Sequence, residues 1–498
     1  MKKIYILVAL LGLLAAACNK DNSTGAGPVV TLKVTGLKDT FNVYTHRDFL
    51  KVTPTVENES SYDFYWTLFS TNFQAGNGII KPDTLTYTKD LNYEVLKDPG
   101  AYILVFNAKE KNTGIVRQVN MVVNITTLTM NGWYLVKDNG GKTDMDFIYP
   151  TGRIDNWISF FNGGKSLDGN LMSVAYVPQF KTVLTTQNTY PALMVVSQND
   201  AAIYRVDNGS MVMNYDNMFF SKPAVRKPQT VFQPINTAII GFINDNKIYS
   251  MSKGTLFGNY PLTYLNISYS NVSPVVADAA MDLGWDPTRK SIFLYNGQTP
   301  KEMIANDTNG VKKLQNVNGN LQWMTGYTGG RSVALVLFRN PQDTGYLYKL
   351  NASFGPLYNG APGKIVMNAD TLKPQHGLMN ASIIGGNYDV DLIYYVYNGK
   401  VYMTDVASAT ETPLFDVPAG ETVTAIQHIR YPEPTGTPVP PATLNVIAIA
   451  TYSGGRYKIY QHPISGTGTI APVAASYDGV GRVTKMIYME KGAGTRIY

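Results

Sequence analysis

The residue types that most often carry catalysis or hold metals are sparse in this chain. Its four histidines, His46, His376, His428 and His462, are scattered, and none belongs to an H-E-x-x-H motif or pairs with a cysteine. Cys18 is the single cysteine, and no G-x-S-x-G elbow occurs. The sequence therefore gives no indication of a zinc site, a cysteine nucleophile or a serine hydrolase. We expect a protein that is not an enzyme.

One short segment carries oxygen side chains at alternate positions, namely Asn387, Asp389 and Asp391. Calcium accepts such ligands, but it takes about six or more oxygens, and no further carboxylate follows at a suitable spacing. We expect an ordinary solvated turn here, with a calcium site as the weaker alternative. No other cofactor is expected.

A compact polar group lies at His428, Arg430 and Tyr431, in and just after an apolar stretch. Three side chains of this kind could bind a ligand, whereas a histidine that simply fills space in the packing is the competing interpretation.

Aromatic side chains could offer a sugar or a peptide a platform, although core packing is the competing interpretation for each of them. The candidates are Trp157, Phe160, Trp285, Trp323 and Tyr327.

A repeated strand–turn–strand pattern must position these side chains. Apolar stretches recur at spacings of 45, 43, 42, 59, 43 and 60 residues, centred on Val196, Gly241, Gly284, Gly326, Gly385, His428 and Tyr488. A partner stretch follows most of them, at Ile203, Ile292, Leu347, Val401 and Tyr457. Periods of roughly 40–50 residues with this content are typical of β-propeller blades. We predict a propeller of seven blades, with eight as the alternative, whose innermost strands are the first set of stretches. Glycine would let their crowded backbones approach.

The two ends of the repeat region are expected to share one blade. If the last inner strand ends near Tyr488, residues 132–138 and 145–150 can supply its outer strands and leave no open sheet edge. Residues 151–187 fit the repeat poorly and are expected to form an extra strand pair or a long loop. The proline-rich segment 432–443 is expected to be an extended loop at a blade edge, with a contact to a partner as the alternative.

An alternating apolar pattern with about seven short strands fills residues 28–127 and predicts a β-sandwich. Trp66 is expected in its core. Tyr65-Trp66, the hairpin start Pro99-Gly100-Ala101-Tyr102 and the turn Asn112-Thr113-Gly114 resemble PKD domains, an immunoglobulin-like family. The W-D-F-G-D-G continuation of that family is absent, because Thr67-Leu68-Phe69-Ser70 stands there. The module is therefore similar to a divergent member.

The amino terminus has the pattern of an export signal. A basic start, an apolar run too short to span a bilayer and three alanines precede Cys18. Residues 1–17 resemble a bacterial lipoprotein signal, although Ala15 stands where leucine is preferred; a plain secretory signal is the alternative. The resemblance implies lipidation of Cys18, with residues 18–27 as a flexible tether. Asn19 in place of aspartate favours the outer membrane.

Composition excludes some classes of partner. The chain has 498 residues, of which 44% are hydrophobic and 16% charged, as in a folded protein. Its net charge is +6, without a run of five basic residues, which argues against nucleic acid. Its 34 tyrosines suit β-structure and also contact with carbohydrate.

The whole chain resembles the PKD-like lipoproteins of Gram-negative gut-type bacteria, because it combines an export leader, a PKD-like sandwich and a predicted propeller in residues 128–498. That resemblance implies an accessory in a nutrient-uptake locus, beside a TonB-dependent transporter and its surface-binding lipoprotein. The first hypothesis is a non-catalytic, lipid-anchored protein of the outer membrane that captures a glycan or a peptide. It would face the cell surface, or alternatively the periplasm. An interaction scaffold for another envelope protein is the second hypothesis, and a propeller hydrolase or lyase is the third. Ligand identity and oligomeric state stay open.

Overall fold

The computed structural model describes residues 32–71, 82–181, 189–232, 239–252, 258–259, 282–295, 301–302, 314–327, 332–352, 365–387, 389–432, 438, 440–490 and 496–497. Contacts divide the chain into two compact units, Met1–Thr126 and Thr127–Tyr498. Strands dominate both, which confirms the predicted all-β class. The described helical elements are α2 (Trp157–Phe161) and the 3-10 turns η1 (Glu59–Ser61) and η2 (Gly377–Asn380). Within the described ranges, no helix combines the length and apolar character that crossing a membrane requires.

The first unit is a sandwich of short strands. The main sheet has the order β2-β9-β8-β5-β6, and the pairs β3-β7 and β1-β4 accompany it. The strands are β1 (Val34–Thr35), β2 (Thr40–Tyr44), β3 (Phe49–Val52), β4 (Thr55–Val56), β5 (Tyr62–Ser70), β6 (Asp83–Thr86), β7 (Leu91–Glu94), β8 (Gly100–Glu110) and β9 (Val116–Thr126). The period-two burial of β3 and β5 shows why the sequence alternates there.

Trp66 lies at the centre of this unit, as predicted. Its side chain is fully buried, and its ring centroid lies 4.8 Å from that of Phe106. The indole Nε1 donates a hydrogen bond to the carbonyl of Lys89 at 2.9 Å. A tryptophan whose polar atom is satisfied inside the sandwich is a core residue rather than a ligand platform.

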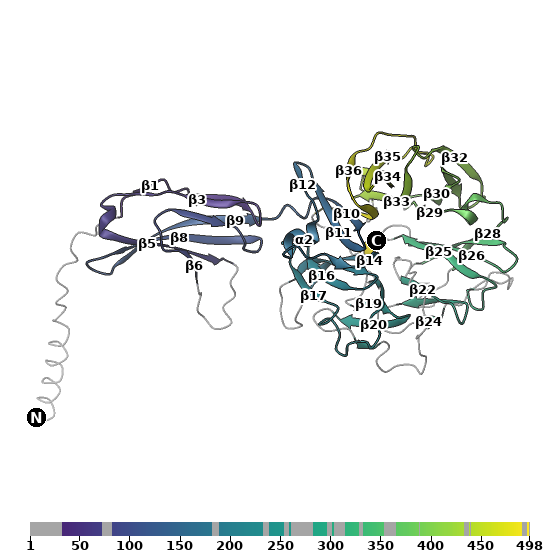
Figure 1. Ribbon diagram of the computed structural model, residues 1–498, viewed down its shortest axis with the longest axis horizontal. Coiled ribbons are helices and arrows are strands. Elements are labelled where there is room, and N and C mark those ends of the chain that lie inside the picture. Colours follow the sequence, from purple (N-terminus) through teal and green to yellow (C-terminus); the bar gives the residue numbers. More distant parts are fainter. Residues whose placement is uncertain are drawn as a thin grey trace, which may run out of the picture. The chain divides into compact units, whose positions relative to one another are not determined.

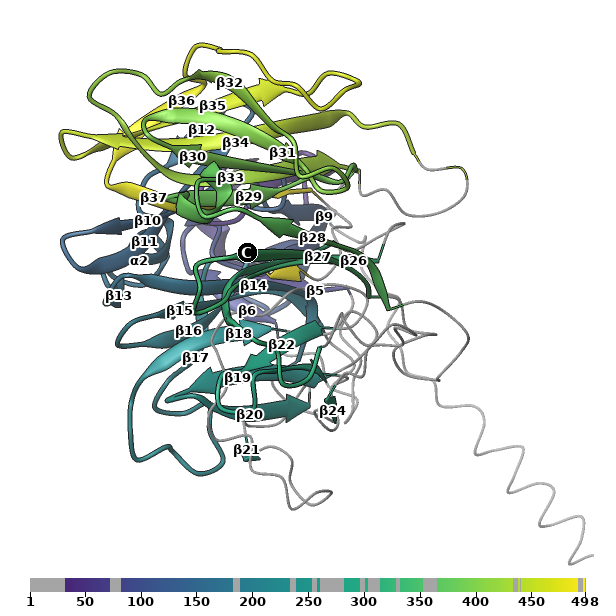
Figure 2. The same cartoon turned by 90° about the vertical axis from the view of Figure 1, so that its right-hand side faces the viewer.

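The described strands of the second unit form seven sheets arranged in a ring (Figure 1). The orders are β37-β10-β11-β12, β14-β15-β16-β17, β18-β19-β20-β21, β22-β23-β24, β25-β26-β27-β28, β29-β30-β31-β32 and β33-β34-β35-β36. The two-residue strands β13 and β38 pair in addition with β11 and with the other edge of β14. Figure 2 shows the same sheets from the side. The propeller class is confirmed, while a total of seven blades for the whole chain stays a prediction.

The strands of the second unit are short, as blades require. Their bounds are β10 (Gly132–Asn139), β11 (Lys142–Tyr149), β12 (Gly152–Ile154), β13 (Leu167–Asp168), β14 (Leu171–Phe180), β15 (Tyr190–Ser197), β16 (Ala201–Arg205), β17 (Met211–Asn214), β18 (Pro228–Phe232), β19 (Ile239–Asn244), β20 (Lys247–Ser252), β21 (Gly258–Asn259), β22 (Asp282–Asp286), β23 (Ser291–Tyr295), β24 (Lys301–Glu302), β25 (Asn320–Tyr327), β26 (Val333–Arg339), β27 (Gly345–Asn351), β28 (Val366–Leu372), β29 (Ile383–Gly386), β30 (Leu392–Tyr397), β31 (Lys400–Asp405), β32 (Glu411–Asp416), β33 (Thr422–Tyr431), β34 (Leu444–Ser453), β35 (Arg456–Pro463), β36 (Tyr477–Val480), β37 (Arg482–Met489) and β38 (Arg496–Ile497).

The ring is closed by the two ends of the repeat region, as predicted. The late strand β37 pairs antiparallel with β10, so that Trp133 lies opposite Tyr488, and β11 extends the same sheet outward. We call β37-β10-β11-β12 the closing sheet and β33-β34-β35-β36 the last sheet. Closure satisfies backbone groups that would otherwise form an open edge.

The predicted set of innermost strands is correct for only part of the ring. Gly326, Gly385, His428 and Tyr488 lie on the first strand of their sheets, and Gly284 lies on the first described strand of its sheet. Val196 and Gly241, in contrast, lie on the second strands β15 and β19, behind β14 and β18. First and second strands are both buried and apolar, so hydrophobicity alone does not distinguish them.

The described part of residues 151–187 forms neither the extra strand pair nor the long loop that was expected there. Their described part adds β12 and β13 to the closing sheet, forms α2, and then supplies β14 as the first strand of the next sheet. Asp144 holds α2 in place, because its carboxylate accepts from the backbone N–H groups of Ile158 and Ser159 at 2.9 and 3.3 Å.

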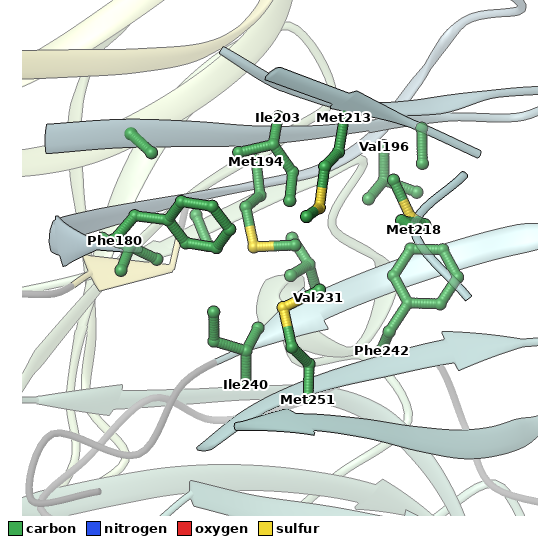
Figure 3. Packing of buried hydrophobic residues seen from close by; sticks show 14 of the residues in the cluster. Phe180, Met194, Val196, Ile203, Met213, Met218, Val231, Ile240, Phe242 and Met251 are labelled. Atoms are coloured by element: carbon green, nitrogen blue, oxygen red, sulfur yellow. The ribbon is translucent and has the colours of Figure 1, made fainter. Parts of the chain in front are cut away.

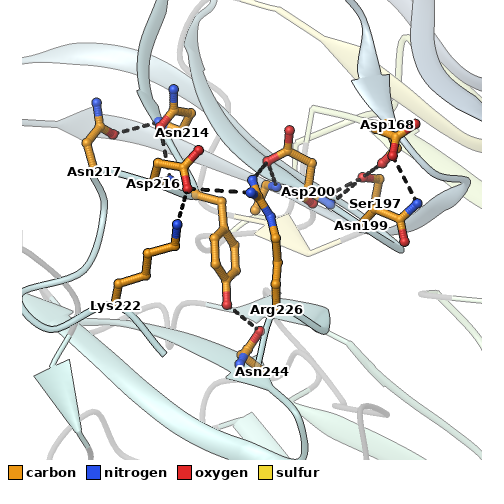
Figure 4. A network of polar contacts seen from close by, with 12 residues as sticks. Asp168, Ser197, Asn199, Asp200, Asn214, Asp216, Asn217, Lys222, Arg226 and Asn244 are labelled. Carbon is orange, nitrogen blue, oxygen red and sulfur yellow. Dashed lines mark hydrogen bonds and ion pairs between the residues drawn. The ribbon is translucent and has the colours of Figure 1, made fainter. Parts of the chain in front are cut away.

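Neighbouring sheets pack through apolar faces and are joined by polar contacts at their rims. Between β14–β17 and β18–β21, the side chains of Met194, Met251 and Phe242 meet in one cluster (Figure 3). At the rim of the same two sheets, Arg226 binds the carboxylates of Asp200 at 2.8 Å and Asp216 at 3.4 Å (Figure 4). The sheets are therefore held rigidly beside one another.

Candidate functional site

Two adjoining hollows open on the last sheet, and the second of them lies where that sheet meets the closing sheet. The first has a volume of about 450 Å³ and is lined by Glu421, Tyr457 and Lys458, among others. The second has a volume of about 320 Å³ and is lined by Lys137, Arg153, Asp155 and Asn156, among others. Arg456 and Asp478 line both. We call the two hollows together the closure groove.

Outer strands of both sheets bring these residues together. Arg456 and Tyr457 begin β35, Asp478 lies on β36 beside them, and Arg153 lies on β12. The Arg153 Nη1 donates to the backbone carbonyl of Asp478 at 2.7 Å, which connects the two sheets directly. Gly454 and Gly455 make the preceding turn at φ of 57° and 83°, a conformation that favours glycine.

A buried carboxylate organises the floor of the groove. Asp146 is fully buried, and its two oxygens bind Lys137 Nζ at 2.6 Å and Arg153 Nη2 at 2.9 Å. The Tyr457 hydroxyl donates to the same carboxylate at 2.8 Å. Burial, together with the neighbouring charge of Asp146, raises the pKa of Tyr457 well above its usual value, so the hydroxyl remains a donor. Such a satisfied network fixes its members in one geometry.

A second carboxylate lies in the first hollow. Glu421 accepts hydrogen bonds from Lys458 Nζ at 2.6 Å, from Thr451 at 2.6 Å and from Tyr460 at 2.9 Å. Burial alone would raise the pKa of Glu421, but these donors outweigh burial and lower it. The carboxylate is therefore an ionised hydrogen-bond acceptor.

The charges that line the groove are balanced. Arg456 pairs with Asp478, Lys458 with Glu421, and Arg153 with both Asp146 and Asp155. A surface rich in donors and acceptors but without excess charge suits a polar ligand that is itself close to neutral.

The predicted polar group at His428 is engaged with the protein itself. His428 is buried, and its Nε2 lies 2.6 Å from the Asn445 Oδ1. Arg430 Nε lies 3.3 Å from the Asp389 carboxylate, and its two terminal nitrogens donate to the carbonyls of Pro432 and Pro440 at 2.9 Å. Arg430 thereby binds the proline-rich segment at its first residue, Pro432, and again at Pro440.

Tyr431 belongs to the same strand, and its ring lies 6.0 Å from that of Tyr488. This contact joins β33 of the last sheet to β37 of the closing sheet.

The three oxygen side chains considered for calcium each face protein donors. Asn387 Oδ1 accepts from the backbone N–H of Asp389 at 2.8 Å, as in an Asx turn. Asp389 pairs with Arg430, and Asp391 binds Lys349 Nζ at 2.5 Å. Among the described residues, no cluster of three acidic, histidine or cysteine side chains is placed to hold a metal ion.

The aromatic candidates are not brought together. Trp157 and Trp285 are buried in two different core clusters, and Trp323 is half-buried against a third. Phe160 is 60% exposed. The side chain of Tyr327 and the whole of Cys18 lie outside the described residues.

Sequence reasoning missed the residues of the closure groove. The sequence did hold one signal for the site, because charged residues are unusual in strands that are otherwise buried. The charged residues in question are Lys137, Asp144 and Asp146. Their partner Tyr457 could not be found in this way, because it lies 311 residues from Asp146 along the chain and reaches it only when the ring closes.

Comparison with known proteins supports the sequence resemblance. Residues 30–170 match the PKD-like family, which covers the described first unit and continues into β13 of the second. No curated protein matches the chain.

Three solved structures are among those to which this chain is similar. A quinonprotein alcohol dehydrogenase-like protein from Bacteroides thetaiotaomicron is 12% identical, with 91% of this chain and 97% of that chain covered and a TM-score of 0.46. The WD40 domain of SCAP from fission yeast is 8% identical, with 63% of this chain and 74% of that chain covered and a TM-score of 0.31. The extracellular domain of a one-component system from B. thetaiotaomicron is 11% identical, with 94% of this chain and 58% of that chain covered and a TM-score of 0.32. At these identities and TM-scores, the three structures carry no conclusion about the function of this chain.

Proposed function

We propose that this protein, whose residues 30–170 match the PKD-like family, is a non-catalytic binding protein that captures a glycan or a peptide in the closure groove of its propeller. The observation that carries the proposal is the groove itself. It is open, and the side chains that line it are held in place by the paired carboxylates Asp146 and Glu421. Ligand sites of this kind lose little conformational freedom on binding.

The chemistry of the groove supports binding rather than bond cleavage. A general acid needs a carboxyl group whose pKa is raised towards neutrality. Glu421 is instead ionised by three donors, and Asp146 is held between two cations. Hydrogen bonding is what these groups are arranged to do.

The sequence patterns supply the setting of the proposal. Lipidation of Cys18 would anchor the chain in the outer membrane, with residues 18–27 as a tether. There it would present its ligand to a TonB-dependent transporter and the surface-binding lipoprotein of that transporter. The sandwich of residues 28–127 would act as the spacer.

Isothermal titration tests the proposal. The chain 28–498 is titrated with a panel of neutral oligosaccharides and a panel of unstructured peptides. We expect one panel to contain a ligand. For that ligand, Arg456→Ala should weaken binding by about tenfold, the loss expected for a hydrogen bond to a charged group. Lys400→Ala is the matched control, since Lys400 is also an ion-paired cation on a strand but lies outside the groove.

Other outcomes point to the alternatives. Equal binding by wild type and Arg456→Ala would contradict the site. Absence of binding to both panels, with capture of a purified envelope protein instead, would favour the scaffold. Release of a cleaved product from any panel member would favour a hydrolase or lyase.

A further inference from the structure

A third hollow lies between the last sheet and the preceding sheet β29-β30-β31-β32, which are neighbours in the ring (Figure 1). Its volume is about 50 Å³. Phe415 of β32 lines it from one sheet, and Ile449 and Tyr460 line it from the other. Pro418 and Pro472 also line it and are exposed, so the hollow is open to solvent. We call it the apolar hollow.

The strand register places the apolar hollow beside the first hollow of the closure groove. Residues that lie opposite each other in antiparallel strands share a face of the sheet, as do residues two apart on one strand. Thr451 lies opposite Lys458. Two residues further along each strand, Ile449 lies opposite Tyr460 on the same face. The first pair lines the first hollow, the second pair lines the apolar hollow, and Thr451 lines both.

Two loops of the last sheet also continue from one hollow to the other. Before β33, Pro418 lines the apolar hollow and its neighbour Ala419 lines the first hollow. Before β36, Val473 lines the apolar hollow and Ala475 lines the first hollow. The two hollows therefore adjoin along three segments of the chain, and one ligand can occupy both.

The hydroxyl groups in the apolar hollow are already engaged with the protein. Thr451 and Tyr460 both donate to the carboxylate of Glu421, at 2.6 and 2.9 Å. A sugar hydroxyl placed here would lose its hydrogen bonds to water and find these groups occupied, which is unfavourable. A hydrocarbon group has no hydrogen bonds to lose.

The other polar side chains of the apolar hollow are engaged as well. His462 Nδ1 lies 2.7 Å from the carbonyl oxygen of Ala471, and the imidazole stacks on the ring of Phe415 at 5.0 Å. One face of each ring is therefore covered by the other ring and offers no platform to a sugar. Asp416 pairs with Lys400 at 3.3 Å and is 80% exposed, so its carboxylate is hydrated.

The size of the apolar hollow fits a compact side chain. A water molecule takes up about 10–15 Å³ of such space, so the hollow has room for about four non-hydrogen atoms. The side chain of leucine has that size, and the side chain of valine is slightly smaller. A pyranose ring with its hydroxyls is much larger.

We propose that the ligand of the closure groove is a peptide, and that it places a side chain of leucine or valine size in the apolar hollow. This choice of ligand rests on the proposed function and decides between its two ligand classes. An extended peptide advances about 3.3 Å per residue and turns alternate side chains to the same side. A polar side chain two residues away would therefore reach the first hollow, where Arg456 and Asp478 are more than half exposed.

Isothermal titration of the chain 28–498 with one neutral, unstructured peptide tests this assignment. The peptide carries leucine, alanine or serine at its centre and is otherwise unchanged, and neutral oligosaccharides are titrated beside it. We expect the leucine peptide to bind about ten- to hundredfold more tightly than the serine peptide, as burial of its side chain predicts. The alanine peptide should lie between them.

A variant that fills the apolar hollow tests its position. Val473→Phe should reduce the preference for leucine over serine to less than about threefold, because the larger side chain excludes leucine. Val225→Phe is the matched control, since Val225 is an exposed valine that precedes β18 in another sheet, and it should retain the full preference. The peptide series on the unchanged chain gives its answer even if Val473→Phe does not fold.

Failure of the peptide assignment and failure of the proposed function give different results. Equal binding of the leucine and serine peptides, both weakened by Arg456→Ala, would overturn the assignment and leave the proposed function intact. Binding of an oligosaccharide that depends on Arg456, without binding of any peptide, would do the same. An undiminished leucine preference in Val473→Phe would exclude the apolar hollow as the site. Absence of binding to both panels would overturn the proposed function itself.

Discussion

At the scale of single residues, Asp146 is the side chain on which the closure groove depends. It is fully buried, and the side chain of its partner Lys137 is only 3% exposed. Asp146→Asn should lower the free energy of unfolding by about 3–5 kcal/mol, because it leaves a buried ammonium uncompensated. Urea unfolding of the wild type and the variant measures the difference.

Asp155→Asn is the matched control, since Asp155 also pairs with Arg153 but is 60% exposed. Exposed pairs contribute about 0–1 kcal/mol. Equal losses for the two variants would contradict a buried network at the floor of the groove.

His462 should make stability depend on pH. Its ring is buried beside Phe415, and burial lowers its pKa from the ordinary 6.5. As pH falls below about 6.5, the unfolded chain binds a proton that the folded chain does not, so this residue makes the folded state less stable. The melting temperature of the wild type should therefore fall between pH 7 and pH 5. The melting temperature of His462→Gln should fall less over the same range. An unchanged slope in the variant would show that His462 is not the source.

At the scale of elements, two glycines that look alike in sequence have different surroundings. A Cβ at Gly385 on β29 would lie 2.4 Å from the backbone oxygen of Ile426 on the next inner strand. One at Gly241 on β19 would meet the ring of Phe232, which lies directly opposite. Gly385→Ala should therefore destabilise the fold by about 1–3 kcal/mol, and Gly241→Ala by less, since a side chain can rotate and a backbone cannot. Chemical denaturation measures the free energy of unfolding of both variants. A larger loss for Gly241→Ala than for Gly385→Ala would contradict this prediction.

The repeat shows which parts of the elements the sequence could predict. The partner stretches at Ile203, Ile292, Leu347, Val401 and Tyr457 all lie on the third strand of a sheet, or on its second described strand in the case of β23. Their pattern is reliable because a polar turn precedes each. The stretches before the turns are apolar on both faces, and for that reason Val196 and Gly241 were assigned to the wrong strand.

The candidate site was far less predictable than the strands. Lys137 and Tyr457 are more than 300 residues apart and become neighbours only through the pairing of β10 with β37. His428 and Arg430 drew attention because they interrupt an apolar pattern, yet their partners Asn445 and Asp389 show that they hold loops and strands together. Chemical type alone does not separate these two roles.

At the scale of the whole molecule, closure should decide whether the propeller unfolds as one body. A chain that ends at Val480 lacks β37 and leaves β10 without its partner. It should lose the single cooperative transition in thermal unfolding, because the first and last sheets are no longer joined. A chain that ends at residue 490 keeps β37 and should retain that transition. If both chains lost the cooperative transition, the loss would be due to the missing residues 491–498, which both chains lack, and not to the missing pairing of β37 with β10.

The first unit should be separable from the ring. Contacts within Thr127–Tyr498 form their own compact unit, so a chain of residues 128–498 should unfold cooperatively by itself. Calorimetry measures this directly. A broad, non-cooperative transition would count against the boundary.

A crystal structure of residues 128–498 with the tightest ligand of the two panels is the most direct test of the proposed function. We predict ligand density between β12 and the β35–β36 hairpin, with hydrogen bonds to Arg456 and Asp478. Density on another face of the ring, with an empty closure groove, would contradict the account.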